Sequence, residues 1–88
     1  MTRDEILERI STIIKRICKR EEVNPDDSIL DDLDMESIEV FVMLGQVEME
    51  YGAVIPVWYL RKIDTVDDLV QAVETLAGGP LVRESYEA

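Results

Sequence analysis

The stretch Leu33-Asp34-Met35-Glu36-Ser37-Ile38-Glu39 lies where an acidic segment ends and an apolar segment with helical spacing begins. From residue 38 to residue 51 the chain has no proline and one glycine, and apolar residues recur at the spacing of one helix face. Ser37 is therefore expected at or next to the N-terminus of a helix. Backbone N–H groups there lack intrahelical partners and the helix dipole is positive, so a phosphate attached to Ser37 would be held favourably.

Ser37 has two possible roles, as a helix N-cap only or as a residue that is catalytic or covalently modified. Serine is a preferred N-cap residue, and that interpretation stays open at the level of sequence. The chain contains no histidine, and residues 21 to 60 contain no lysine or arginine. A serine nucleophile with a histidine base is thus impossible, and no basic side chain lies near Ser37 in sequence to replace it. Ser37 is more consistent with a modified residue than with a catalytic one, and we expect no enzyme.

The segment around Ser37 resembles the attachment site of the acyl carrier protein family, whose members carry 4′-phosphopantetheine on a serine in an Asp-Ser-Leu motif. The motif here reads Glu36-Ser37-Ile38, and Asp34 stands where the family commonly has glycine. Three further stretches resemble the family in order and spacing: the amphipathic N-terminal helix, Tyr51-Gly52-Ala53-Val54-Ile55-Pro56, and Thr65-Val66-Asp67-Asp68-Leu69. The likeness covers residues 1 to 76, approximately.

This resemblance implies a mechanism in which the chain itself catalyses nothing. A phosphopantetheinyl transferase would move the arm from coenzyme A to Ser37, and the terminal thiol of the arm would hold an acyl group as a thioester. Acyl-transferring or acyl-modifying enzymes with basic patches would be the partners, in a specialised fatty-acid, polyketide or lipid pathway. Family members can shelter the acyl chain between their helices. Residues that would line such a cleft, or belong to an ordinary core, are Phe41, Leu44, Val47, Ile55, Leu60 and Ile63.

Start and stop patterns predict four helices. Thr2 and Glu5 have capping-box spacing before a first helix of about sixteen residues, whose last turn is rich in bases that complement the helix dipole. A loop follows, and Ile29, Leu30 and Leu33 are expected to pin it to the core, because long unanchored loops are uncommon in small domains. The second helix should end at Gly52 in a left-handed conformation.

Pro56 is expected to open a short third helix that reaches about Lys62. Thr65 and Asp68 have the spacing of a cap and an acidic third residue for the fourth helix, which Gly78-Gly79-Pro80 ends. Each helix has one apolar face, and these faces can be buried only against one another. The prediction is an all-α fold, a small four-helix bundle with three longer helices and one short third helix. The carrier domain covers residues 1–78, and residues 79–88 form a mobile C-terminal tail.

The net charge of −11 is concentrated in the middle of the chain. Residues 1 to 20 hold six bases and three acids, residues 21 to 60 hold eleven acids and no base, and residues 61 to 88 hold three bases and six acids. Such a charge repels nucleic acid and anionic membranes and attracts basic protein surfaces. An acidic helical protein-interaction module without a cofactor is therefore the alternative function. The acidic segment does not match an EF-hand calcium loop, because Ser37 and Met43 stand where that loop requires glycine and glutamate. No metal site is therefore expected.

Composition also bears on location and association. No apolar run approaches the length of about 20 residues needed to span a bilayer, and the first twenty residues do not read as a leader. The single cysteine, Cys18, excludes an intramolecular disulfide and is read as a small core residue. We expect a cytoplasmic monomer.

The second helix carries a further apolar stripe opposite its core face. At about 100° per residue, Val40, Met43, Leu44, Val47 and Tyr51 face the bundle, and Phe41 lies at the margin of that face. The opposite side is a possible partner surface with flanking acids, although scattered surface hydrophobes or cover by the third helix would also explain it. The residues expected to bind partners are Asp34, Glu36, Ile38, Glu39, Val42, Gly45, Glu48, Met49 and Trp58.

Overall fold

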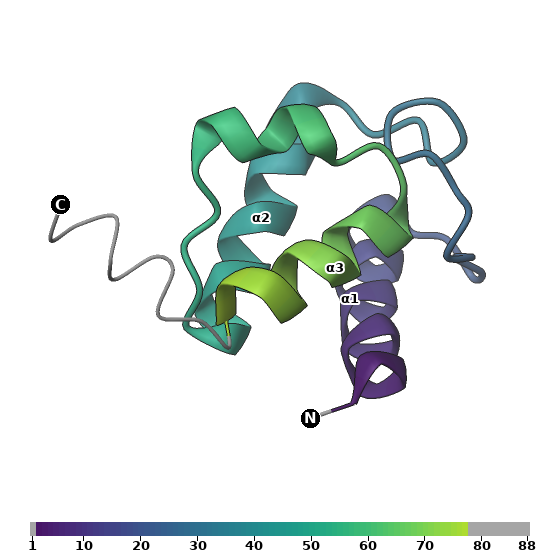
Figure 1. Cartoon of the computed structure of the whole chain (residues 1–88). Helices are drawn as coiled ribbons and strands as arrows, with labels where there is room; N and C mark the ends of the chain where they lie inside the picture. The colour runs from purple at the N-terminus through teal and green to yellow at the C-terminus, as the bar shows by residue number, and fades with distance from the viewer. Residues whose placement is uncertain (1, 78–88) are drawn as a thin grey trace, which may run out of the picture.

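The computed structural model describes residues 2–77, and the predicted C-terminal tail lies outside this range. Four helices follow one another: α1 (Arg3–Cys18), α2 (Ser37–Tyr51), the 3-10 helix η1 (Val57–Lys62) and α3 (Val66–Ala77). In Figure 1, α1 and α2 lie beside each other, α3 crosses in front and η1 lies across one end. Both α2 and α3 pack on α1. The predicted small all-α bundle is confirmed.

The first helix begins and ends as its residues dictate. Thr2 is the N-cap, and its backbone N–H donates to the Glu5 carboxylate at 2.9 Å, so the predicted capping box is present. The helix ends at Lys19, which adopts the left-handed conformation with φ 56°. A lysine is an unusual residue there, and the sequence pattern did not indicate it.

The loop between α1 and α2 is anchored by apolar side chains and by α3. Ile29 and Leu33 are buried as predicted, whereas Leu30 is exposed, so its predicted anchoring role is wrong; Met35 is buried in its place. The N–H groups of Val66 and Asp67 donate to the carbonyls of Asp27 at 3.0 Å and of Pro25 at 2.9 Å, respectively. The first turn of α3 thus donates to the loop the hydrogen bonds that it cannot make within the helix.

The core lies between the inner faces of the three longer helices and the buried residues of the loop. Full burial of an isoleucine, leucine or valine stabilises the fold by about 1.5–3 kcal/mol relative to exposure of the same side chain. Cys18 is half-buried against this cluster. The fully buried large side chains are Ile10, Ile14, Met43, Val47, Val66, Leu69, Val70 and Val73.

The segment after α2 follows the sequence prediction with one refinement. Gly52 ends α2 at φ 63°. Pro56 is extended and serves as the N-cap of η1, so the short helix starts at Val57, one residue later than predicted. Thr65 and Asp68 exchange hydrogen bonds of 3.0 and 3.1 Å at the start of α3, as their spacing predicted. No helix within residues 2–77 has the length and apolar character needed to cross a membrane.

Candidate functional site

Ser37 is the first residue of α2 and its side chain is exposed. The N-cap is Glu36, in an extended conformation, so the plain-cap interpretation of Ser37 is wrong. The first hydrogen bond of the helix runs from the N–H of Val40 to the carbonyl of Glu36 at 3.0 Å. The N–H groups of Ser37 and Ile38 precede this bond and point out of the helix end. The Ser37 hydroxyl forms no hydrogen bond with another residue between 2 and 77, which leaves it free to react.

The backbone that leads to Ser37 is held in place from both sides. Asp34 adopts the left-handed conformation with φ 52°, a region that glycine occupies without steric cost. The next residue, Met35, is buried, and its N–H donates to the carbonyl of Ile29 at 3.3 Å. Ser37 therefore follows an anchored residue by two positions, and the serine is presented on a fixed part of the fold rather than on a loose loop.

These features fit a phosphopantetheine group on Ser37. Attachment needs an accessible hydroxyl, and the phosphate is best held where helix N–H groups are free and the dipole is positive. Glu39 does not compete for the hydroxyl, because its carboxylate accepts the backbone N–H of Glu36 at 2.9 Å. When bound, the group supplies a thiol at the end of a long arm.

The outer face of α2 is apolar and exposed, as its angular layout predicted. Ile38 is 70%, Val42 is 47% and Met49 is 86% exposed. A Cβ added at Gly45 would meet no atom within 4 Å, so internal packing does not require glycine there. Phe41 lies at the margin of the core face and is 63% exposed, so the reading of Phe41 as an ordinary core residue is wrong. At about 100° per residue it lies between the core face and the stripe.

The acids predicted to flank the stripe have internal partners. The carboxylate of Glu48 accepts the N–H of Ile55 at 2.8 Å and so ties the link after α2 to the helix. Glu39 caps the start of α2 in the same way. Glu36 belongs to the same capping box but is exposed, and Asp34 is exposed without a side-chain hydrogen bond to another residue from 2 to 77. Sequence spacing alone does not reveal such side-chain-to-backbone contacts.

Trp58 is exposed on η1, as expected for a contact residue. The ammonium group of Lys62 lies 5.7 Å from the centroid of the Trp58 ring and 5.5 Å from that of Tyr59, a cation–π arrangement that steadies the aromatic pair. The neighbouring Val57 is also exposed.

The six residues proposed as an acyl cleft do not form one set. Leu44, Val47 and Ile55 are buried in the core, and Phe41 is exposed. Leu60 and Ile63 are half-buried against the core. Two surface grooves lie instead between α1 and α2.

Other reactive groups of the described chain give no support for catalysis. Burial raises the pKa of the Cys18 thiol above its ordinary value, and the nearby Glu39 carboxylate raises it further, so the thiol is protonated at neutral pH. Within residues 2–77 no three histidine, cysteine, aspartate or glutamate side chains are grouped to hold a metal ion.

Comparison with known proteins shows the family to which the chain belongs. The family described as "Phosphopantetheine attachment site" matches residues 6–73, a range that contains the whole of α2. A small helical bundle with an exposed serine at a helix start and this family match define a carrier domain. The chain is 35% identical over 78 residues to the meromycolate extension acyl carrier protein of Mycobacterium leprae, covering 86% of this chain and 68% of the relative.

Two further relatives bear the general name acyl carrier protein. The protein of Petrotoga mobilis is 38% identical over 72 residues, covering 80% of this chain and 85% of the relative. That of Rhodococcus erythropolis is 32% identical over 77 residues, covering 85% of each. The chain belongs to the acyl carrier protein family, so it is a carrier with covalently attached 4′-phosphopantetheine and not an enzyme. The cofactor-free interaction module is not favoured.

Proposed function

We propose that Ser37 carries the phosphopantetheine arm and that the arm holds acyl intermediates of a specialised lipid pathway as thioesters. The observation that carries the proposal is the free, exposed Ser37 hydroxyl at the start of α2. The other serines among residues 2–77 are less suitable. Ser11 is buried, and the Ser28 hydroxyl donates to the Asp64 carboxylate at 3.1 Å and accepts the N–H of Asp31.

Intact-mass measurement after incubation with coenzyme A and a broad-specificity phosphopantetheinyl transferase tests the attachment point. The wild-type chain and the control Ser28→Ala should each gain one phosphopantetheine, and Ser37→Ala should gain none. Ser37→Ala should keep its melting temperature, because the hydroxyl has no partner in residues 2–77. A Ser37→Ala protein that still gains the mass would disprove the assignment.

The pathway is proposed from the relatives and from the surface of α2. Several relatives are named for meromycolate extension, and the exposed stripe makes this helix more apolar than a general carrier requires. The cargo is then a lipid acyl chain rather than an amino acid. Isolation of the modified protein from its source, followed by mass spectrometry of the thioester, identifies the acyl group. An aminoacyl thioester would contradict the proposal.

The outer stripe of α2 is the docking surface for partner enzymes in this proposal. Exposed Ile38, Val42 and Met49 supply apolar contact, and Gly45 lets a partner approach the helix backbone. Asp34 and Glu36 beside Ser37 attract basic patches and orient the partner during encounter.

Charge substitutions on the stripe test this docking surface. Val42→Glu and Met49→Glu should keep the fold and the modification of Ser37, weaken binding of the native acyl-transferring enzyme, and raise the rate of malonyl transfer from a general fatty-acid transferase. Val54→Glu is the matched control, because Val54 is as exposed as Val42 but lies outside α2. Equal effects of Val42→Glu and Val54→Glu on both enzymes would assign the change to net charge alone.

A further inference from the structure

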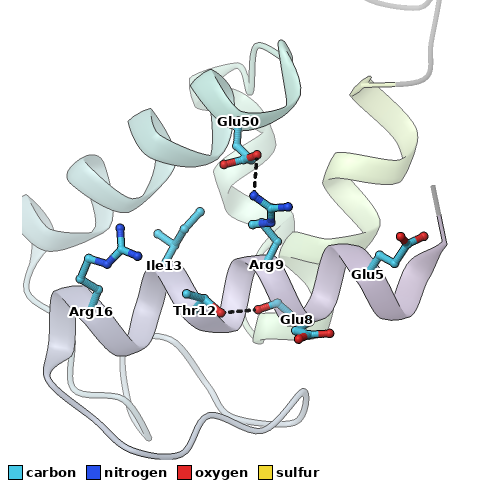
Figure 2. Close-up of a pocket in the computed structure, with 7 residues that line it drawn as sticks. All are labelled: Glu5, Glu8, Arg9, Thr12, Ile13, Arg16 and Glu50. Carbon is cyan, nitrogen blue, oxygen red and sulfur yellow. Dashed lines mark hydrogen bonds and ion pairs between the residues drawn. The ribbon is translucent and has the colours of Figure 1, made fainter.

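The apolar stripe of α2 ends in a groove that also belongs to α1. Met49 lines this groove together with Ile13 and Arg16 of α1. The groove measures about 380 Å³ and adjoins a second one of about 440 Å³ that reaches further along α1. Figure 2 shows Arg9, Ile13 and Arg16 rising from α1 toward α2. A partner that covers the stripe as far as Met49 therefore also meets α1.

The charge of the groove differs from that of the other end of the stripe. The Arg9 guanidinium donates to the Glu50 carboxylate at 3.0 Å, so these two charges compensate each other (Figure 2). Arg16 is exposed and forms no ion pair with any residue between 2 and 77. The groove thus holds one uncompensated cation beside Met49, whereas acids surround Ser37 at the start of α2.

The distance between the two ends sets the size of the partner element. Ile38 and Met49 are eleven positions apart in one helix, which is about 16 Å at a rise of 1.5 Å per residue. This span corresponds to about three helical turns of a partner. The distance between the two ends exceeds the screening length of about 8 Å at physiological salt. Each end can therefore attract its own sign of charge on one partner element.

We propose that the docking element of the partner carries both signs of charge in a fixed order. Basic side chains face Asp34 and Glu36 at the Ser37 end, an apolar seam covers the stripe, and one carboxylate enters the groove and pairs with Arg16. This inference rests on the docking surface proposed above. A wholly basic element would bring like charge against Arg16. A second copy of this chain is disfavoured as the occupant, because two molecules with a net charge of −11 each repel.

Two synthetic helical peptides test the proposal with the unmodified full chain. Both have a leucine seam and lysines at one end; at the other end one has a glutamate and its counterpart has a glutamine. Affinities are measured by fluorescence anisotropy at low ionic strength, and contact residues by NMR shifts. The ratio of the two affinities removes the general attraction between a basic peptide and an acidic protein. Arg16→Glu should lower the preference for the glutamate peptide about fivefold, because it removes one exposed ion pair and also places a like charge beside the peptide glutamate.

Arg61→Glu is the matched control, because it makes the same change in net charge on η1, outside the groove. It should leave the peptide preference unchanged. Arg16→Gln, which keeps a good helix former and adds no charge, should give an intermediate preference. Equal preferences in wild type and Arg16→Glu, an equal shift in Arg61→Glu, or NMR shifts away from Met49 would each overturn the proposal. So would binding of neither peptide.

Analytical ultracentrifugation of the protein without peptide tests whether a second copy of the chain occupies the groove, because it measures the oligomeric state. A monomer for both wild type and Arg16→Glu supports the proposal, and a wild-type dimer that Arg16→Glu abolishes would assign the groove to a second copy. The peptide measurements use the chain before modification. Their failure is therefore distinguishable from a failure of Ser37 to accept the arm.

Discussion

At the scale of single residues, the conformation of the backbone before Ser37 is as important as the serine. Asp34 has φ 52°, where an L-residue other than glycine is usually strained, although aspartate tolerates this region better than most. Burial of Leu33 before Asp34 and of Met35 after it holds the residue in this conformation. Part of the packing energy around Ser37 is therefore offset by the strain at Asp34.

Replacing Asp34 by glycine should relieve that strain. We expect Asp34→Gly to stabilise the fold by up to about 1 kcal/mol and Asp34→Val to destabilise it by about 1–2 kcal/mol. Urea denaturation followed by circular dichroism gives the free energies of unfolding. Asp31→Gly is the control for loss of a negative charge, because Asp31 is exposed nearby and has no positive φ. A similar gain in Asp31→Gly would attribute the effect to charge rather than to backbone strain.

At the scale of elements, the start of each of the three α-helices is closed by a side chain that accepts backbone N–H groups. Glu5, Glu39 and Asp68 have this role for α1, α2 and α3, respectively. The Asp68 carboxylate accepts the N–H of Thr65 at 3.0 Å and that of Asp64 at 2.9 Å. These hydrogen bonds favour the charged carboxylate and so hold the pKa of Asp68 below its ordinary value of 3.8. The hydrogen bond from Thr65 has the larger effect.

The depressed pKa makes the contribution of Asp68 depend on pH. Because the folded-state pKa lies below the unfolded one, its stabilisation is complete above the unfolded value of 3.8 and is lost as pH falls through the folded value. Asp68→Asn should cost about 1 kcal/mol of unfolding free energy at neutral pH, and the difference from wild type should shrink in acid below that unfolded value. Asp26→Asn, at an exposed position away from the Thr65–Asp68 cap, is the control, and its difference from wild type should not shrink in acid. A pH-independent loss in Asp68→Asn would reject this role of the charge.

At the scale of the whole molecule, few of the charges compensate one another. Within residues 2–77 the ion pairs join Arg3 to Asp67 and Glu74, and Arg9 to Glu50. Exposed pairs of this kind contribute little to stability, because solvent screens them. Glu50 is the one member of the acidic run from 21 to 60 that enters them. Several of the others accept backbone N–H groups, but these contacts leave the excess negative charge in place.

Salt should therefore stabilise the protein. Screening of the self-repulsion outweighs the loss of a few surface ion pairs, and 1 kcal/mol of relief would raise Tm by roughly 4–8 °C for a domain of this size. Tm should rise with sodium chloride at neutral pH, and magnesium chloride should act at lower concentration. Differential scanning calorimetry measures the effect. A Tm that stays constant or falls across the titration would show that the acids are already compensated in the fold.

The sequence by itself determined the helical elements and the place of Ser37 at a helix start. Helix spacing, caps at Thr2 and Thr65, and Gly52 as a stop depend on neighbours within a few residues, so local patterns contain the necessary information. Absence of histidine excluded one kind of catalysis in the same direct way.

Only the tertiary structure decided which apolar residues are used for packing and which acids remain free. Leu30 was predicted to pin the loop to the core and Phe41 to line a cleft or the core, but both are exposed, whereas Met35 is buried. Glu48 read as a surface acid but binds the N–H of Ile55, and Arg16 and Met49 meet in one groove. Such outcomes depend on how separate helices pack against each other, which periodicity within one helix does not specify.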